Sequence, residues 1–260
     1  MQSSRLAEAL RSRRPAVGCA HMIADVTVSE LLRSVDLDFV LVDTQHVALS
    51  VESLQRMVIA LQPTELSVLV RPASNDPVLI GQALDVGATG VIVPMVNSGD
   101  EARRVVDAAR YPPEGRRSWG PSKRAMRGSA SDYAREANRE VVVLAQVETA
   151  LAVQNLDEIL SVEGLSGIMV GPADLAISLG YSEDRGNAEV EKVFVSIRDR
   201  CRERDVPFGF FTSNAEQATH WIEEGSLITT CSSDTDFVAR GVQSLAATLR
   251  SAAQQASSTR

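Results

Sequence analysis

Residues 67–94 read SVLVRPASNDPVLIGQALDVGATGVIVP and contain one complete strand–helix–strand unit. The apolar, β-branched runs at 67–71 and 90–94 are typical of buried strands, and Pro77–Val86 between them has the spacing of an amphipathic helix. Strands that are apolar along their whole length and alternate with helices indicate a parallel sheet covered on both faces. This unit therefore predicts an α/β fold.

The same alternation continues from this unit towards both ends of the chain. The predicted strands are Ala16–Met22, Phe39–Asp43, Ser67–Arg71, Gly90–Pro94, Val141–Val147, Gly167–Val170, Pro207–Phe211 and Leu227–Cys231. Amphipathic helical segments include Val51–Leu61, Pro77–Val86, Gly99–Ala109, Ala150–Leu160, Val190–Arg204 and Asn214–Glu224. Eight strands in 260 residues favour a closed (β/α)8 TIM barrel over an open sheet. The nucleotide signatures of open sheets, GxGxxG and GxxxxGK[ST], do not occur in the sequence.

We expect residues 1–260 to form a single barrel domain with its core at about 15–247. Leu6 and Leu10 predict a short amphipathic helix ahead of the first strand, and the small, polar ending SAAQQASSTR predicts a flexible tail. The longest break in the alternation, Tyr111–Arg139, is interpreted as a long loop after the fourth strand, followed by a short helix. Long ordered loops at that end of a barrel usually carry function.

The composition narrows the classes of partner. A formal net charge of −8 disfavours binding to a nucleic-acid backbone. Three scattered cysteines, Cys19, Cys201 and Cys231, predict reduced thiols rather than a disulfide framework or a CxxC metal site. No apolar run is long enough to span a bilayer, and the basic start has no apolar core of a secretory signal. We therefore expect a cytoplasmic protein that binds neither nucleic acid nor membrane.

Polar side chains stand where a barrel places its chemistry, at the carboxyl ends of the strands. They are Asp43 and His46 after the second strand, Arg71 after the third, Gln146 and Glu148 after the fifth, and Asp174 after the sixth. The carboxylates of Glu148 and Asp174, from neighbouring strands, are suitable ligands for Mg²⁺, Mn²⁺ or Co²⁺. Alternatively, both residues cap the helices that follow them, because acidic side chains favour helix N-termini. His21, at the end of the first strand, could face the same mouth, whereas His220 is expected on a helix surface.

Two of these side chains each allow a second interpretation. Arg71 must face either an anionic ligand or a carboxylate of a neighbouring strand, because an unpartnered buried guanidinium is costly. His46 could relay protons near neutral pH or serve a structural role.

Two kinds of chemistry are disfavoured. The continuations of the last two strands, GFFTSN and TTCSSD, lack a glycine-rich phosphate-binding loop. Lys123 and Lys192, the only lysines, fall outside the strand ends, which argues against a Schiff base.

Several motifs, taken together, resemble the HpcH/HpaI family of class II, pyruvate-dependent aldolases, related to the citrate lyase β-subunit. They are LVDTQH, RP followed by LDVGATGVIVPMV, ARYPPEGRRSWGPSKRA, LAQVETALAVQNLDEIL and GLSGIMVGPADLAISLGY, and the resemblance runs from about Pro15 to Ala247. It implies a barrel of the phosphoenolpyruvate/pyruvate-domain type. It also implies a homo-hexamer, a trimer of dimers, in which C-terminal helices are exchanged between neighbours.

The resemblance also assigns roles to residues. Glu148 and Asp174 match the ligands of a divalent metal, Mg²⁺, Mn²⁺ or Co²⁺, to which pyruvate binds through its carboxylate and keto oxygens. Arg71 matches the arginine that contacts the keto oxygen, and His46, supported by Asp85, matches the group that transfers protons. A further acidic member and the substrate-contacting positions correspond to Asp43, Gln146, Gly171, Pro172, Ala173, Ser122 and Phe211.

The chain departs from the family pattern near the aldehyde acceptor. Gln45 stands where many members carry glutamate, Val47 follows where a small residue is commoner, and Phe211 could narrow the acceptor pocket. The predicted function is cleavage of a 4-hydroxy-2-oxo acid to pyruvate and an aldehyde, with the acceptor undefined. The alternatives are a citramalyl- or malyl-CoA type lyase, an oxaloacetate decarboxylase-like enolate former, and a non-catalytic barrel that binds a keto acid.

Overall fold

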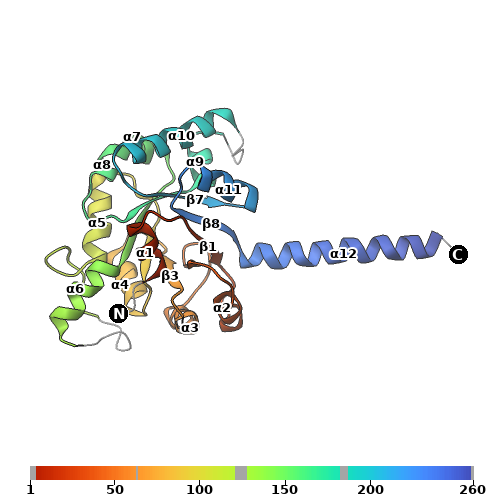
Figure 1. Cartoon of the computed structure of the whole chain (residues 1–260), viewed down its shortest axis with the longest axis horizontal. Coiled ribbons are helices and arrows are strands. Elements are labelled where there is room, and N and C mark those ends of the chain that lie inside the picture. Colours follow the sequence, from red (N-terminus) through yellow and green to blue (C-terminus); the bar gives the residue numbers. More distant parts are fainter. Residues whose placement is uncertain (1–3, 63, 121–127, 182–186, 259–260) are drawn as a thin grey trace.

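The computed structural model describes residues 4–62, 64–120, 128–181 and 187–258. Within these ranges, eight parallel strands close into a barrel in chain order, which confirms the predicted (β/α)8 fold (Figure 1). The strands are β1 Ala16–His21, β2 Phe39–Asp43, β3 Ser67–Arg71, β4 Gly90–Val93, β5 Val142–Val147, β6 Gly167–Val170, β7 Phe208–Thr212 and β8 Ile228–Ser233. The helices are α1 Arg5–Arg11, α2 Val26–Arg33, α3 Val51–Leu61, α4 Pro77–Asp85, α5 Gly99–Ala109, α6 Ala130–Glu140, α7 Ala150–Gln154, α8 Leu156–Leu160, α9 Pro172–Ser178, α10 Ala188–Glu203, α11 Ala215–Glu223 and α12 Asp234–Ser258.

Predicted and observed strands agree closely. β2, β3 and β6 have the predicted bounds, and the other strands differ by one or two residues at an end. The predicted helix Ala150–Leu160 is instead two short helices that meet at Asn155, which caps both of them. The side chain of Asn155 donates to the backbone oxygen of Asn97 at 2.8 Å. This contact anchors the junction to the loop after β4.

Alternating side chains of each strand build two apolar layers. In β2, Phe39 and Leu41 pack with other residues of the barrel interior, whereas Val40 and Val42 pack with the surrounding helices. All four side chains are completely buried. A strand that is buried on both faces must be apolar throughout, which explains why the strand sequences lack a polar period.

Helix α1 fills the base of the barrel, the end where the strands begin. Leu6 and Ala9 are fully buried and belong to the interior cluster that includes Leu41, Leu69 and Leu144. The backbone nitrogen of Leu6 donates to the hydroxyl of Ser67, the first residue of β3, at 2.9 Å. The predicted N-terminal helix is therefore confirmed, and it closes one end of the barrel.

The segment Tyr111–Gly120, with which the predicted long loop begins, lies at this base and not at the functional end. Helix α5, whose predicted bounds are confirmed, runs back along the barrel between β4 and the loop, so the prediction that the loop lies at the functional end was wrong. The backbone nitrogens of Arg116 and Arg117 donate to the oxygens of Asp107 and Arg110, which holds the loop against the end of α5. Tyr111 packs against Trp119 in the same loop, with ring centroids 5.3 Å apart.

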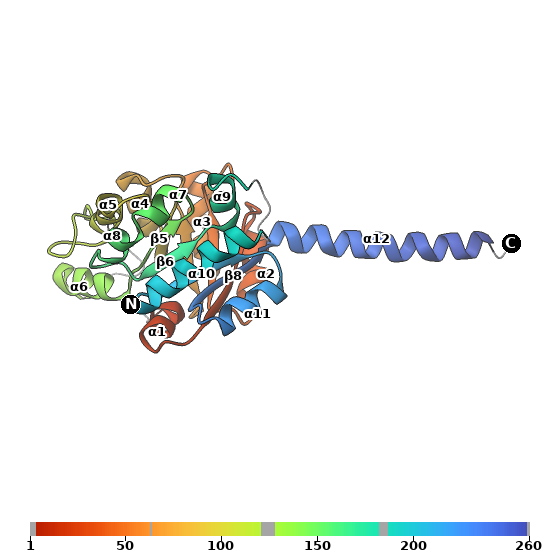
Figure 2. The same ribbon diagram turned by 90° about the horizontal axis from the view of Figure 1, so that it is seen from above.

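Helix α12 extends away from the barrel as a single long element (Figures 1 and 2). Its first residue, Asp234, accepts hydrogen bonds from the ring of His21 at 2.7 Å and from the backbone nitrogens of Met22 and Ile23. This helix covers most of the segment for which the sequence predicts a flexible tail. An apolar ridge runs along it, in which each side chain is at least 46% exposed: Phe237, Val238, Val242, Leu245 and Leu249. Among the described helices, α12 included, none has both the length and the apolar character needed to cross a bilayer.

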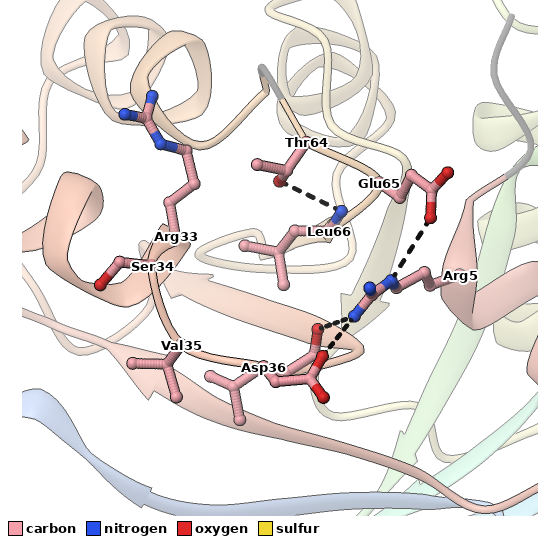
Figure 3. Close-up of a pocket in the computed structure, with 9 residues that line it drawn as sticks. Arg5, Arg33, Ser34, Val35, Asp36, Thr64, Glu65 and Leu66 are labelled. Atoms are coloured by element: carbon pink, nitrogen blue, oxygen red, sulfur yellow. Dashed lines mark hydrogen bonds and ion pairs between the residues drawn. The ribbon is translucent and has the colours of Figure 1, made fainter.

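A pocket of about 270 Å³ lies at the base, between the loops that lead into β2 and β3 (Figure 3). Arg5 donates to Asp36 at 2.9 Å and lies 3.7 Å from a carboxylate oxygen of Glu65. Arg33, on the opposite wall, donates to the backbone oxygen of Ala60 at 2.8 Å. The charged groups of this pocket already have protein partners, and the pocket lies at the opposite end of the barrel from the strand ends that carry the candidate chemistry.

Candidate active site

An ion pair occupies the carboxyl ends of β2 and β3. Asp43 and Arg71 are register partners there, and Arg71 donates from Nε to Oδ1 at 2.9 Å and from Nη2 to Oδ2 at 2.6 Å. Asp43 is 1% exposed and the Arg71 side chain 13%. Burial opposes ionisation of Asp43, but the hydrogen bonds and charge of Arg71, with the nearby charge of His46, hold its pKa below the ordinary value. The sequence allowed two partners for Arg71, an anionic ligand or a carboxylate of a neighbouring strand. In the structure Arg71 is paired with such a carboxylate, that of Asp43.

Glu148 follows β5 and is 1% exposed. Its Oε1 accepts from the backbone nitrogen of Met95 at 2.7 Å, and its Oε2 accepts from the side-chain amide of Gln146. Burial, together with the negative charge of Asp174, raises the pKa of Glu148 above its ordinary value despite these hydrogen bonds and the charge of Arg71. A carboxyl group that is hard to ionise without a partner is a candidate ligand for a cation.

Asp174 reaches the same region from the start of α9, after β6. It is exposed, and it lies in the first turn of a helix that begins at Pro172 and is preceded by Gly171. A side chain at Gly171 would place its Cβ 2.8 Å from the Cβ and 2.9 Å from Oε2 of Glu148. Glycine is thus required for the close approach of this turn to Glu148. Ala173 is half-buried in the same turn.

The donors present suit a hard divalent cation. Carboxylate and amide oxygens are the ligands that Mg²⁺ and Mn²⁺ prefer, and each Glu148 oxygen retains a lone pair beyond its one hydrogen bond. The buried Oε1 of Gln146 has no hydrogen-bond partner among the described residues. Within the same residues there is no group of three or more His, Cys, Asp or Glu side chains around one point. The two carboxylates would therefore need further oxygen ligands from substrate or water.

Phe211, on β7, lies close to the ion pair. The guanidinium carbon of Arg71 lies 5.5 Å from the centre of the Phe211 ring, across the barrel from β3 to β7. Thr230, the register partner of Phe211 on β8, has a buried hydroxyl with no partner among the described residues. The buried Oε1 of Gln45 likewise has none within the described part of the chain. These unsatisfied polar atoms border the mouth and could bind ligand or water.

The structure does not bring Asp85 to His46 within one chain. His46 is exposed after β2, at the mouth, whereas Asp85 is the last residue of α4, which runs from the mouth to the base. There Asp85 accepts from Arg117 at 2.7 Å. Ser122, the remaining residue that the resemblance assigns near the substrate carboxylate, lies outside the described residues.

The other two histidines lie away from the mouth chemistry. His21 is fully buried between Asp234 and Ser29, at 2.7 Å from each, so its side chain does not face the mouth. His220 is exposed on α11, as predicted.

Sequence reasoning missed the backbone and amide groups that hold the acidic residues. The N–H of Met95, a left-handed residue with φ 57°, could not be foreseen as a partner of Glu148. Asn97 and Thr149, which support that turn, were also missed. The sequence hint to these contacts was that short polar pairs, Asn97–Ser98 and Glu148–Thr149, follow the neighbouring strands β4 and β5.

A (β/α)8 barrel with two carboxylates, a buried arginine–aspartate pair and a histidine at its mouth belongs to the class of barrel enzymes that act on small anionic substrates. The family model described as HpcH/HpaI aldolase/citrate lyase matches residues 22–240. The 4-hydroxy-2-oxo-heptane-1,7-dioate aldolase of Escherichia coli is 37% identical over 241 residues, which are 92% of each chain. The chain therefore belongs to the HpcH/HpaI aldolase/citrate lyase family, as its motifs predict, and is a carbon–carbon lyase.

Solved structures agree with this assignment. An HpcH/HpaI aldolase from Desulfitobacterium hafniense DCB-2 superposes with a TM-score of 0.85 at 27% identity, covering 92% of this chain and 95% of that one. A citrate synthase, SbnG, superposes with a TM-score of 0.88 at 27% identity, covering 96% and 98%. The likeness extends over almost the whole barrel in both cases.

Proposed function

We propose that the protein is a divalent-metal-dependent class II aldolase that cleaves a 4-hydroxy-2-oxo acid to pyruvate and an aldehyde and catalyses the reverse addition. The observation that carries this proposal is the arrangement of Glu148. It is a buried carboxylate with a raised pKa, beside the charge of Asp174 and within the field of Arg71. Family membership supplies the reaction class, and this arrangement supports the proposal that the site lies at the mouth of the barrel.

Glu148 and Asp174 are the residues that would hold the cation. When bound, a divalent cation supplies Lewis-acid polarisation of the keto oxygen of the substrate. Gln146 and the turn Gly171–Ala173, which includes Pro172, would seat the substrate carboxylate. The unpartnered Oε1 of Gln146 and the close packing at Gly171 support a ligand position there.

Arg71 would stabilise the negative charge that develops on the keto oxygen when the C3–C4 bond breaks. Its Nε and Nη2 are held by Asp43, which fixes the plane of the guanidinium, and Nη1 is the group that would contact the substrate. A preorganised donor of this kind needs no reorientation during the reaction. Asp43 is thus proposed as the residue that orients Arg71.

His46 would transfer the protons. In the cleavage direction it accepts the proton of the C4 hydroxyl as the aldehyde leaves, and C3 then takes up a proton to give pyruvate. Asp85 lies at the base of its own barrel, so it could support this histidine only from a second copy of the chain. This requirement agrees with the oligomer that the family resemblance implies.

We further propose a homo-hexamer in which α12 of one subunit packs on its neighbour. The apolar ridge on α12 is exposed in the single chain and would be buried by such an exchange. The preferred metal is proposed to be Mg²⁺, Mn²⁺ or Co²⁺.

A screen coupled to lactate dehydrogenase tests the function. Purified protein is supplied with a series of 4-hydroxy-2-oxo acids and with each of the three metals, and pyruvate release is followed. We expect release that EDTA abolishes and that both Glu148→Ala and Asp174→Ala lack. Activity that survives saturating EDTA would refute the proposal. Cleavage of malyl-CoA but of no free keto acid would identify a CoA-ester lyase instead, and turnover of oxaloacetate alone would identify a decarboxylase.

A further inference from the structure

Asn97 ties together the loops that follow β4 and β5. Its Nδ2 donates to the backbone oxygen of Met95 at 2.8 Å, and its Oδ1 accepts from the hydroxyl of Thr149. Its backbone nitrogen donates to Glu101 at 2.7 Å, and its backbone oxygen accepts from Asn155 at 2.8 Å. Every polar group of Asn97 is therefore engaged, and the side chain spans two loops rather than supporting one.

The two side-chain contacts of Asn97 lie on either side of Glu148. Met95 provides the N–H that Oε1 of Glu148 accepts at 2.7 Å, and Thr149 is the residue that follows Glu148 in the chain. Met95 has φ 57°, a conformation that residues other than glycine rarely adopt. Such a turn persists only where its surroundings hold it, and the bond from Asn97 to the Met95 carbonyl does so directly.

Fixing this turn determines which way Glu148 points. One carboxylate oxygen is held by Met95 and the other by Gln146, so the remaining lone pairs have defined directions. If the Met95 turn relaxed, Oε1 would lose its partner and the carboxylate could rotate away from Asp174.

We propose that Asn97 is a positioning residue for the candidate metal site. By holding the left-handed turn at Met95 and linking it to Thr149, it fixes the conformation in which Glu148 presents its oxygens beside Asp174. This inference rests on the proposed function, in which those two carboxylates hold a divalent cation. Hydrogen-bond partners of metal-ligating groups typically change metal affinity about 10–100-fold when removed.

The test is the affinity of the full-length chain for Mn²⁺, measured by calorimetric titration with MnCl2 and by the electron paramagnetic resonance signal of free Mn²⁺. Asn97 acts on Glu148 through Met95, so we expect Asn97→Ala to raise the dissociation constant about threefold or more, the equivalent of one neutral hydrogen bond, in a variant whose metal-free form remains folded. Asn75→Ala is the matched control. It removes an asparagine bond of 3.2 Å to the backbone of Glu101 at the same rim without touching Met95, and it should bind Mn²⁺ as the wild type does.

Each outcome separates this inference from the proposed function. A folded Asn97→Ala variant that binds Mn²⁺ within twofold of the wild type overturns the role of Asn97, provided that Glu148→Ala abolishes binding. If the wild type binds no Mn²⁺, or if Glu148→Ala binds it equally well, the proposed metal site itself fails and the inference falls with it. If Asn97→Ala does not fold, the Mn²⁺ dissociation constant of Thr149→Val, which lacks the hydroxyl that donates to Asn97, decides the test. A dissociation constant raised about threefold or more, equivalent to one neutral hydrogen bond, supports the proposal, and an unchanged constant overturns it.

Discussion

Replacing Arg71 with methionine should destabilise the barrel as well as abolish turnover. The variant removes both hydrogen bonds to Asp43 and leaves a 1% exposed carboxylate that retains a bond of 3.0 Å from the backbone nitrogen of Gln45. Removing one partner of a buried ion pair costs about 3–5 kcal/mol. Because that bond remains and the arginine is 13% exposed, we expect the lower limit, about 3 kcal/mol. This corresponds to a fall in Tm of roughly 6–12 °C.

The pH dependence of the stability loss in Arg71→Met tests whether the unpaired Asp43 carboxylate causes it. In the wild type the pKa of Asp43 is lowered by folding, so the pair stabilises the fold above the unfolded pKa, and this contribution is lost as pH falls through the folded value. In Arg71→Met, burial is opposed only by the hydrogen bond from Gln45 and the nearby charge of His46, and the pKa of Asp43 should rise above its unfolded value. Protonation of Asp43 then favours the folded state. The deficit should therefore shrink as the pH is lowered from 8 towards 5.

The measurement is urea unfolding of metal-free wild type, Arg71→Met and Asp43→Asn/Arg71→Met at one protein concentration, with pyruvate release assayed in parallel. The double variant should recover part of the lost stability near pH 7.5 and remain inactive. The account of the buried pair would be refuted if the free energy of unfolding of Arg71→Met lay within about 1 kcal/mol of the wild-type value at that pH. It would also be refuted if the difference between the two free energies did not change with pH.

Four further predictions concern other parts of the molecule. Glu148→Gln should raise the Tm of the metal-free protein, and this gain should grow as pH rises through the raised pKa of Glu148, because the wild type then carries a buried charge; a gain independent of pH in calorimetric scans would contradict this. Gly171→Ala should weaken Mn²⁺ binding about tenfold or more by forcing Glu148 aside, and unchanged affinity in a titration would show that the turn can yield. Leu245→Glu/Leu249→Glu should lower the molar mass seen by light scattering, and an intact oligomer would exclude the ridge as a contact. Hybrid oligomers reassembled from Glu148→Ala and Asp85→Ala subunits should recover activity that neither variant has alone, whereas inactivity of the hybrids would argue against Asp85 acting across subunits.

The barrel could be predicted because its strands carry an unambiguous pattern. Phe39–Val42 and Val68–Val70 are apolar throughout and each run is followed by one charged residue, and a strand buried on both faces permits little else. The same argument placed Asp43 and Arg71 at the mouth. Their mutual pairing was one of two open alternatives, since sequence spacing does not reveal the direction of a side chain.

The end of the barrel at which a segment lies depends on chain connectivity and not on composition, and here the prediction was wrong for one loop. The loop from Tyr111 was assigned to the functional end although a helical segment, Gly99–Ala109, precedes it, and each helix of such a barrel returns the chain to the base. The position of Asp85 follows from the same rule. The family resemblance assigns Asp85 the role of supporting His46, but it does not say which subunit would supply Asp85.

The support around Glu148 was beyond prediction for a different reason. The bond from Met95 uses a backbone N–H that every residue except proline carries, and it joins positions 53 apart in the chain. A left-handed methionine has no signature in the sequence, because propensity would place glycine or asparagine there. Contacts of this kind become visible only when the strands have been brought together.

The helix that fills the base of the barrel has a consequence for the order of events in catalysis. With Leu6 and Ala9 packed into the interior, the passage through which a substrate enters is also the passage through which both products must leave. If the keto acid binds against the buried Gln146, as proposed above, the aldehyde fragment would lie nearer this opening. Departure is then expected to be sequential, with the outer fragment released first and the inner one last, so that pyruvate should act as a competitive product inhibitor of the free enzyme.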